Sequence, residues 1–295
     1  MTTEILAAPA PAKLNLFLHV TGRRPDGYHE LETVFQLIDL QDRVHLRLRP
    51  DGAIVRIGGL PGVPAEADLV VRAARLLQAA SGTRLGAEIA LDKTIPMGGG
   101  LGGGSSDAAT VLMSLDRLWR LGWPAARLAE LGLTLGADVP FFLFGRTALA
   151  RGVGERLTPI DLPDSWFVVV APPVSVPTAA VFSAADLTRD TEPLKISGLS
   201  RDDWIWQASN DLEPVVMRRY PEVAAALASL RGAARAVGLD PARARMSGSG
   251  ACVFCPAPTE ALAGQMAREV LRCEVGVVHA CRGLARHPLG SRQVG

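Results

Sequence analysis

The sequence predicts a two-lobed enzyme of the α/β or α+β class. Strand-like and helix-like patterns alternate along the 295 residues, as they do in folds where helices cover sheets. A chain of this length suggests one large domain or two closely packed ones, and it can bury a sizeable core. The Pro-rich stretch from Pro172 to Pro177 is the clearest candidate boundary. We therefore expect an N-terminal lobe over residues 1–172 and a C-terminal lobe over residues 173–295.

The first half of the chain contains the most regular patterns. Apolar residues alternate with polar ones over residues 13–20, which predicts a half-buried strand with Lys13 and Asn15 on its polar face. Further strands are predicted at residues 44–49, 88–91 and 166–171, and helices at residues 68–80, 105–121 and 124–135.

The second half is less regular. Helical spacing predicts helices near residues 178–187, 211–218 and 221–237. A strand–helix–strand pattern covers residues 242–281, with apolar strands at residues 253–255 and 275–280.

Composition excludes several classes of function. Lys and Arg number 31 and Asp and Glu number 30, so the net charge of +1 argues against a nucleic-acid partner. The longest apolar stretch, residues 166–176, is too short to span a membrane and is interrupted by Pro172 and Pro173. The N-terminus lacks the basic region of a secretory signal. We therefore expect a cytoplasmic protein with no membrane partner.

The four cysteines do not indicate a disulfide scaffold. Cys252 and Cys255 have the spacing of a metal-binding pair, but they lie within an apolar run that is typical of a strand. Residues three apart in a strand point to opposite faces, so these two thiols are not expected to bind one metal.

A glycine run provides the strongest functional signal. Six of the seven residues from Gly98 to Gly104 are glycine, and a helix pattern follows, with Ser105 and Ser106 as candidate N-caps. Free backbone N–H groups at a helix N-terminus bind anions, and glycines let phosphate oxygens approach the backbone. The spacing matches neither a Walker A loop nor a dinucleotide-binding loop. The run therefore predicts phosphate binding, with a flexible linker as the alternative.

Two neighbouring features have open interpretations. Asp107 is expected in the first turn of that helix, where it either stabilises the helix dipole or helps to organise Mg²⁺. A second glycine loop covers residues 246–251 between two predicted strands, and a tight turn is its alternative reading.

Candidate catalytic groups are Asp138 and Lys13. Asp138 is the only charged residue between Glu130 and Arg146, and a carboxylate in apolar surroundings is costly unless it is paired or used. It is read as the acceptor of a hydroxyl proton in phosphoryl transfer, or as a turn or N-cap residue before Pro140. Lys13 is its natural partner, although a solubilising lysine on an edge strand is the alternative. Tyr28 and His29 follow a loop glycine and suggest an aromatic platform or ordinary surface residues.

These segments together resemble the GHMP kinase superfamily over nearly the whole chain. Its three motifs stand in order as Pro-Ala-Lys-Leu-Asn-Leu at residues 11–16, the glycine run within residues 96–107, and Met-Ser-Gly-Ser-Gly-Ala at residues 246–251. Two further strings, at residues 24–31 and 136–141, resemble one branch of the superfamily. That branch phosphorylates the C2 hydroxyl of a cytidine diphosphate-linked methylerythritol in non-mevalonate isoprenoid biosynthesis.

The resemblance implies an α+β fold of two lobes. The N-terminal lobe is expected to be like ribosomal protein S5 domain 2 and the C-terminal lobe ferredoxin-like, with a small-molecule substrate between them. ATP and Mg²⁺ are the implied cofactors, and the protein is expected to be a monomer or a weak homodimer.

The resemblance also implies a role for individual residues. Asp138 is the implied catalytic carboxylate, and Lys13 holds it ionised and orients the substrate hydroxyl. ATP contacts are implied for Asp68, Lys93, Pro96, Met97, Gly98, Gly99, Gly100, Leu101, Gly102, Gly103, Gly104, Ser105 and Ser106. Ser106 and Asp107 are the implied metal ligands. Substrate contacts are implied for Asn15, Tyr28, His29, Thr178, Phe182, Gly248, Ser249 and Gly250, with Tyr28 and Phe182 on the two faces of the cytosine and His29 at its edge.

Three questions stay open at this level. The superfamily branch usually has Asn where this chain has Asp68, and a carboxylate can accept from the adenine amino group but cannot donate. Asp138 acts either as a full base or as an orienting group. The chain could also be another kinase of the superfamily, such as one for homoserine or mevalonate, or a nucleotide-binding module without activity.

Overall fold

The computed structural model describes residues 3–60, 62–194 and 203–290. The strands in these ranges are β1 (Glu4–Arg23), β2 (His29–Arg49), β3 (Ile54–Arg56), β4 (Gly86–Asp92), β5 (Ala148–Gly152), β6 (Arg156–Pro159), β7 (Trp166–Ala171), β8 (Arg245–Met246), β9 (Val253–Ala257) and β10 (Val277–Leu284). The helices are α1 (Leu69–Ser81), α2 (Gly103–Leu118), α3 (Ala125–Leu133), α4 (Val139–Phe144), α5 (Thr178–Phe182), α6 (Asp203–Gln207), α7 (Glu213–Arg219), α8 (Pro221–Ala236) and α9 (Glu260–Leu271), with a 3₁₀ turn at Pro241–Arg243.

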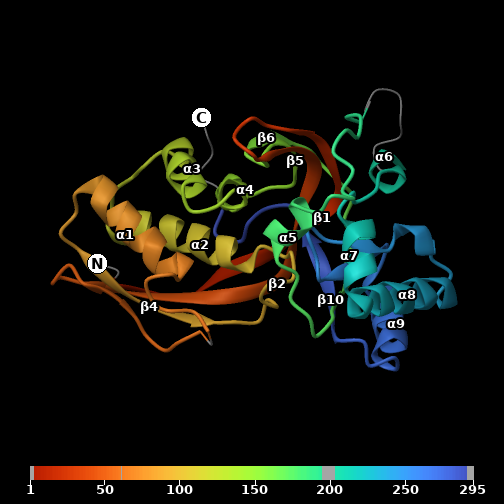
Figure 1. Cartoon of the computed structure of the whole chain (residues 1–295). Coiled ribbons are helices and arrows are strands. Elements are labelled where there is room, and N and C mark those ends of the chain that lie inside the picture. The colour runs from red at the N-terminus through yellow and green to blue at the C-terminus, as the bar shows by residue number, and fades with distance from the viewer. Residues whose placement is uncertain (1–2, 61, 195–202, 291–295) are drawn as a thin grey trace.

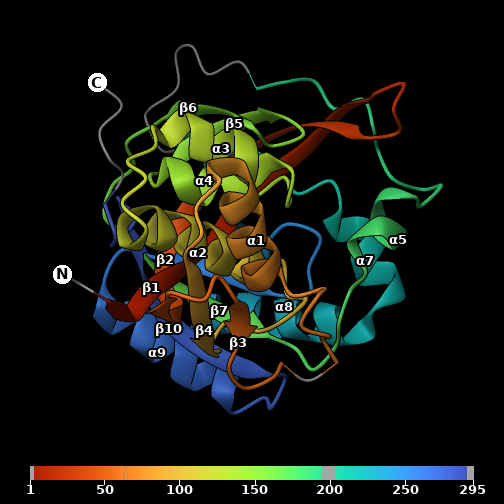
Figure 2. The ribbon, with the colours of Figure 1, turned by 90° about the vertical axis from the view of Figure 1, so that its left-hand side faces the viewer.

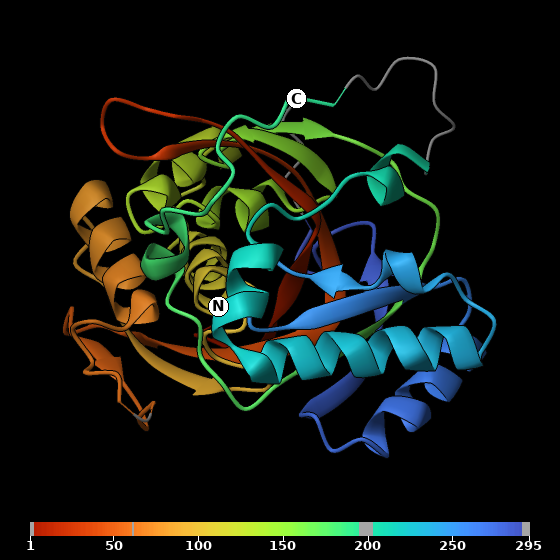
Figure 3. The same ribbon diagram turned by 45° about the vertical axis from the view of Figure 1, so that its right-hand side comes forward.

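The described strands form one continuous sheet. Its main path is β3-β4-β2-β10-β7-β9-β8, and β1 and β5 also pair with β2 while β6 pairs with β5. Helices α1 to α4 gather over the N-terminal strands, and α7 to α9 lie with the C-terminal strands (Figure 1). In Figure 3, α8 runs across the C-terminal strands, where it packs on β7, β9 and α9.

The hairpin of β1 and β2 is the longest pairing in the described part of the chain. Its antiparallel register places Lys13 opposite Leu37 and Asn15 opposite Phe35, with a shift in register after Asn15. Figure 2 shows this hairpin extending from the body of the molecule, with the segment after α5 beside it. That segment pairs with the hairpin, because the Thr191 amide donates to the Val20 carbonyl at 3.1 Å.

The predicted polar face of the first strand is wrong. Residues 10–20 of β1 are buried on both faces, Lys13 and Asn15 included. The strand alternates in chemistry but not in exposure, because α2 packs on one part of it and the C-terminal half of the chain covers another. An edge-strand role in solubility is therefore excluded for Lys13.

Most other predicted elements are present. Strand β7 has the predicted bounds, and each end of the long helices α1, α2, α3 and α8 lies within three residues of its predicted position. Helix α5 is shorter than expected. The elements without a predicted counterpart, including α4, β5 and β6, are at most six residues long. Apolar runs this short do not show whether their spacing is that of a helix or of a strand.

The predicted lobe boundary after residue 172 stays a prediction. Strand β7 precedes that boundary, yet it pairs with β9 and β10, which follow it. The same sheet therefore continues from one half of the chain into the other.

The two cysteines of the C-x-x-C spacing pack into different hydrophobic clusters. Cys252 belongs to a cluster with Phe17 and Phe254, whereas Cys255 belongs to one with Val168 and Met246. Separately, no helix in the described ranges combines the length and apolarity needed to cross a bilayer.

A buried arginine joins elements that are distant in sequence. Arg245 of β8 is 5% exposed, and its guanidinium donates to the carbonyls of Leu16, Ile205, Ala208 and Trp206 at 2.9–3.2 Å. Burial lowers the pKa of Arg245 to about 10, which leaves it charged at neutral pH. The side chain thus holds β8, β1 and the α6 region together.

We expect Arg245→Met to lower the free energy of unfolding by about 2–4 kcal/mol, because four buried carbonyls lose a charged donor. Urea denaturation followed by circular dichroism measures the change. Arg243→Met is the matched control, since Arg243 is exposed and two residues away, and it is expected to change stability by less than about 0.5 kcal/mol. Equal midpoints for the two variants would contradict the role of Arg245.

Candidate active site

A cavity of about 1000 Å³ lies where the two halves of the chain meet. Nearly all residues predicted for the site line it. They are Lys13, Asn15, Tyr28, His29, Asp68, Lys93, Pro96, Met97, Gly98 to Gly104, Ser105, Asp107, Asp138, Thr178, Phe182, Gly248 and Ser249. Ser106 and Gly250 do not line it, so their assigned contacts stay predictions.

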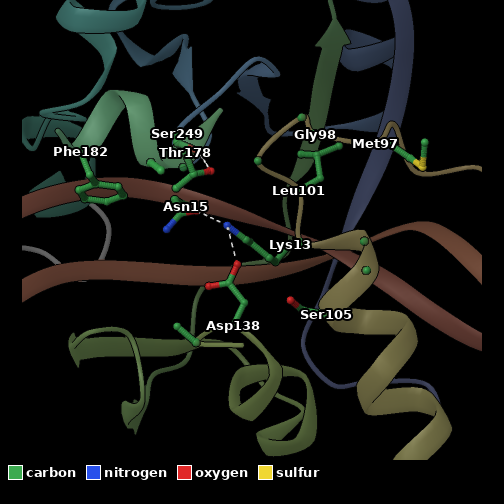
Figure 4. A pocket seen from close by; sticks show the side chains of 18 of the residues that line it. Lys13, Asn15, Met97, Gly98, Leu101, Ser105, Asp138, Thr178, Phe182 and Ser249 are labelled. Carbon is green, nitrogen blue, oxygen red and sulfur yellow. Dashed lines mark hydrogen bonds and ion pairs between the residues drawn. The ribbon is translucent and has the colours of Figure 1, made fainter. Parts of the chain in front are cut away.

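Lys13, Asn15 and Asp138 form the centre of the cavity (Figure 4). The Lys13 Nζ donates to Asn15 Oδ1 at 2.5 Å and lies 3.5 Å from Asp138 Oδ2. Lys13 is almost fully buried, whereas one third of the Asp138 side chain is exposed to the cavity. Asp138 precedes α4 at its N-cap position, but its side chain makes no capping hydrogen bond. The carboxylate therefore faces the lysine and the cavity, and the capping alternative is excluded.

Contacts from both halves of the chain orient Asn15. Its backbone N–H donates to Ser247 Oγ at 3.1 Å, and its Nδ2 donates to Thr33 Oγ1 at 2.9 Å. The Oδ1 atom then has to face Lys13, whose ammonium lies 5.3 Å from the Phe35 ring centre. Lys13 is thus fixed by a hydrogen bond, an ion pair and an aromatic face.

The glycine run forms a tight loop before α2. Gly98, Gly100 and Gly102 have φ values of 69°, 75° and 71°, in the left-handed region that favours glycine. A Cβ on Gly100 would lie 2.3 Å from the Ser247 carbonyl oxygen, so the loop also packs tightly against residues 246–251. Backbone hydrogen bonds hold it from two sides, from the Lys13 amide to Leu101 and from the Cys252 amide to Gly99.

Helix α2 begins two residues earlier than predicted, at Gly103, and Gly102 is its N-cap. The N-cap assignment of Ser105 and Ser106 is therefore wrong. Ser105 lies in the first turn with its hydroxyl on the side of Asp138 (Figure 4), whereas the Ser106 hydroxyl donates to the Pro11 carbonyl at 2.7 Å. The first N–H groups of a helix lack partners within it, so the start of α2 presents donors to the cavity.

Asp107 belongs to a buried cluster with Lys93 and Asp42. It lies in the second turn of α2, not in the first as predicted. Lys93 Nζ lies 2.6 Å from Asp107 Oδ2 and also contacts Asp42 Oδ2. Burial raises the pKa of Asp107 to about 7, although the charge of Lys93 opposes the shift. Its other oxygen, Oδ1, is buried and makes no hydrogen bond to the described residues.

Asp42 was not among the predicted site residues. Its Oδ1 accepts from the amides of Thr94 and Ile95 at 2.6 Å and 2.8 Å, so it holds the chain that leads into the glycine run. Asp42 lies in β2 but two residues before the strand predicted at residues 44–49, so no sequence pattern marked it.

Asp68 caps α1. Its Oδ1 accepts from the Val70 amide at 3.1 Å, and its Oδ2 pairs with Arg56 at 2.7 Å. Both carboxylate oxygens therefore have a protein partner at the wall of the cavity. The implied adenine contact of Asp68 stays a prediction.

The second glycine loop packs directly against the first, and the Ser247 hydroxyl lies 3.4 Å from the Gly100 carbonyl oxygen. Ser249 Oγ and Thr178 Oγ1 lie 2.7 Å apart, which links this loop to the start of α5. Asn210, which was not predicted, donates from Nδ2 to the carbonyls of Met246 and Gly248 at 2.9 Å and 2.8 Å. The loop is thus a fixed wall of the cavity and not only a turn between strands.

The aromatic part of the cavity lies at the tip of the β1–β2 hairpin. The rings of His29 and Phe182 contact each other, with centroids 5.1 Å apart and planes tilted by 32°. Tyr28 is 63% exposed at the same mouth. Arg189, also missed, lies behind this pair and donates to His29 Nε2 at 3.2 Å. The arrangement offers an aromatic surface with a polar ring edge.

The chain is similar to known protein families and to named relatives. Residues 68–146 match the GHMP kinases N terminal domain, and residues 195–275 match the GHMP kinases C terminal domain. Proteins named 4-diphosphocytidyl-2-C-methyl-D-erythritol kinase are similar along almost their whole length. The protein of Aromatoleum aromaticum is 55% identical over 97% of this chain and 96% of its own, and that of Thiobacillus denitrificans is 56% identical over 96% and 97%.

Solved structures agree as well. A crystal structure of 4-(cytidine 5'-diphospho)-2C-methyl-D-erythritol kinase superposes with a TM-score of 0.76 at 39% identity, over 95% of this chain and 98% of that one. Homoserine kinase from Cytophaga hutchinsonii has a TM-score of 0.74 at 18% identity, over 97% and 96% of the two chains, and shows likeness of fold alone. The expected two-lobed fold is confirmed, and the chain belongs to the GHMP kinase family.

Proposed function

We propose that this chain is the ATP-dependent kinase for the C2 hydroxyl of 4-diphosphocytidyl-2-C-methyl-D-erythritol. The products are the 2-phosphate and ADP, and the reaction belongs to non-mevalonate isoprenoid precursor biosynthesis. The relatives that carry this kinase's name support the substrate. The carrying observation is a single cavity that holds an acid–lysine pair, a glycine loop at a helix N-terminus, and an aromatic and imidazole pair.

The acid–lysine pair acts on the acceptor hydroxyl. The C2 oxygen forms a bond to the γ-phosphorus of ATP, the bond from that phosphorus to the bridging oxygen breaks, and the hydroxyl proton passes to the Asp138 carboxylate. Lys13 pairs with Asp138 at 3.5 Å and stabilises the acceptor oxygen as that oxygen gains negative charge. Asn15 keeps Lys13 in place. Positioning and charge neutralisation supply most of the acceleration in such reactions.

The glycine loop and the start of α2 hold the ATP phosphates. Backbone N–H groups there are donors, and the absence of Cβ atoms lets phosphate oxygens approach them. The loop also contacts the Lys13 backbone, through the hydrogen bond to Leu101. The γ-phosphate and the acceptor hydroxyl are therefore brought to the same wall of the cavity.

One residue at the cavity, Asp107, offers a suitable ligand for a magnesium ion. The orphaned Asp107 Oδ1 is an oxygen donor at the cavity wall, the kind of ligand that Mg²⁺ prefers. Ser106 fits less well, because its hydroxyl proton is used by Pro11 and its side chain does not reach the cavity. When bound, Mg²⁺ neutralises phosphate charge. Lys93 holds the Asp107 carboxylate in place through its other oxygen.

The aromatic mouth distinguishes this proposal from its alternatives. Homoserine and mevalonate have no base to stack, whereas Tyr28, His29 and Phe182 present ring surfaces to the cavity. The intact Lys13–Asp138 pair argues against a nucleotide-binding module without activity.

The first test is a coupled ADP-release assay with ATP and Mg²⁺ and four acceptors. These are the cytidine diphosphate methylerythritol, mevalonate, homoserine and galactose. We expect turnover with the cytidine compound alone. Turnover only with another acceptor would support the role of the glycine loop in ATP binding and contradict base recognition by the aromatic mouth. ATP binding without any turnover would favour a nucleotide-binding module without activity.

Asp138→Asn is expected to lower kcat by at least about 100-fold while ATP binding changes only a few-fold, because the amide cannot take the proton. Steady-state kinetics and calorimetric titration with a non-hydrolysable ATP analogue measure the two effects. Asp161→Asn is the control, since Asp161 lies at the exposed surface and should leave both unchanged. Normal turnover by Asp138→Asn would exclude the catalytic role.

Tyr28→Ala is expected to raise the KM for the cytidine substrate about tenfold and to leave the KM for ATP unchanged. The reason is the loss of base stacking, which contributes on the order of 1–3 kcal/mol for each base. Initial-rate kinetics of Tyr28→Ala and Tyr28→Phe check it, and the phenylalanine variant should retain most of the affinity. A change in kcat without a change in KM would rule out stacking by Tyr28.

A further inference from the structure

Arg189 organises the aromatic mouth of the cavity from behind. It lies in the segment after α5. It donates to the carbonyl of Phe182, the last residue of α5, and to those of Ala184 and Leu187, at 2.6–3.0 Å. Its Nε donates to His29 Nε2 at 3.2 Å. One guanidinium therefore fixes both the turn that carries Phe182 and the ring that Phe182 contacts.

The contact with His29 determines where the imidazole carries its proton. A guanidinium has only donors, so His29 Nε2 has to be an acceptor with a free lone pair. In a neutral imidazole the other nitrogen then carries the hydrogen. His29 is consequently a neutral ring with a single donor at Nδ1.

The charges around His29 favour the same state. Arg23, its partner across β1 and β2, and Arg189 both oppose a positive charge on the ring, and Phe182 adds an uncharged wall. Burial is the largest cause that lowers the pKa of His29, followed by Arg189 and Arg23. The ring thus stays neutral at physiological pH.

We propose that Arg189 is a positioning residue that sets the tautomer of His29 and thereby selects cytosine over uracil. This inference rests on the proposed function. The two bases differ at N3, which is an acceptor in cytosine and an N–H donor in uracil. A fixed N–H donor at His29 Nδ1 can donate to N3 of cytosine, whereas it would face the N–H donor at N3 of uracil. Two donors that face each other without an acceptor cost more free energy than the loss of one hydrogen bond.

The tautomer is tested directly in the free protein. Long-range ¹H–¹⁵N correlation spectra of histidine-labelled protein distinguish the two ring nitrogens for each of the five histidines. The His29→Gln variant assigns the His29 signal. We expect the proton at Nδ1 in the unmodified protein, and a mixture of tautomers with a raised pKa in Arg189→Met. A proton at Nε2 in the unmodified protein would overturn the proposal.

Kinetics test the consequence for the base. Arg189→Met is compared with the unmodified enzyme on the cytidine substrate and on its uridine analogue. The preference in kcat/KM for cytidine should fall about tenfold or more, and KM for cytidine should become dependent on pH near the ordinary pKa of histidine. Arg189→Lys, which keeps a donor and the charge, should recover part of the preference.

Asp186→Ala provides the matched control. Asp186 lies in the same segment and anchors it to Arg218 and Arg219, without a contact to His29. Loosening the segment should raise KM for both bases equally and independently of pH. If Arg189→Met behaves in that way, Arg189 has only a structural role and the proposal fails.

Failure of the proposed function is separable from failure of this inference. An unmodified enzyme that does not phosphorylate the cytidine compound overturns the proposed function, and with it the selection of the base. The spectra still decide whether Arg189 sets the tautomer, because they need no substrate.

Discussion

The antiparallel pairing of β1 and β2 is the constraint on which the cavity depends. Along this one ladder, Arg23 stands opposite His29, Lys13 opposite Leu37, and Ala10 opposite Asp42. The aromatic mouth, the acid–lysine centre and the anchor of the glycine loop are therefore placed by one register. A slip of one residue would turn every side chain to the other face of the sheet. The spacing of the three parts is thus built into the hairpin.

Burial makes this arrangement depend on complete pairing. Lys13, Asp42 and Asp107 are nearly inaccessible to water, and a buried charge is destabilising unless it has partners. Lys13 has Asn15 and Asp138, and Asp42 has Lys93 and two backbone amides. Asp107 is the exception, since one of its oxygens has no partner among the described residues. The incomplete pairing occurs where a ligand is expected to bind.

Sequence patterns predicted the groups whose local context was unusual. A lone acid in an apolar stretch marked Asp138, and a glycine run before a helix marked the loop that lines the cavity. Asp42, Asn210 and Arg189 gave no comparable signal. Each has a partner that is 36 or more residues away in the sequence and comes near only through the tertiary fold. For the same reason the pattern of β1 predicted a polar face that is in fact covered.

The glycine run shows that glycines can be required at one place for more than one reason. A Cβ would lie 2.5 Å from Cys252 Sγ at Gly99, 2.3 Å from the Ser247 carbonyl oxygen at Gly100, and 2.9 Å from Phe142 Cζ at Gly102. These three glycines are required by packing, whatever the loop binds. Because the loop is packed between residues 246–252 and α4, its backbone is held in one shape without any bound ligand. The same contacts that exclude side chains therefore preorganise the donors that face the cavity.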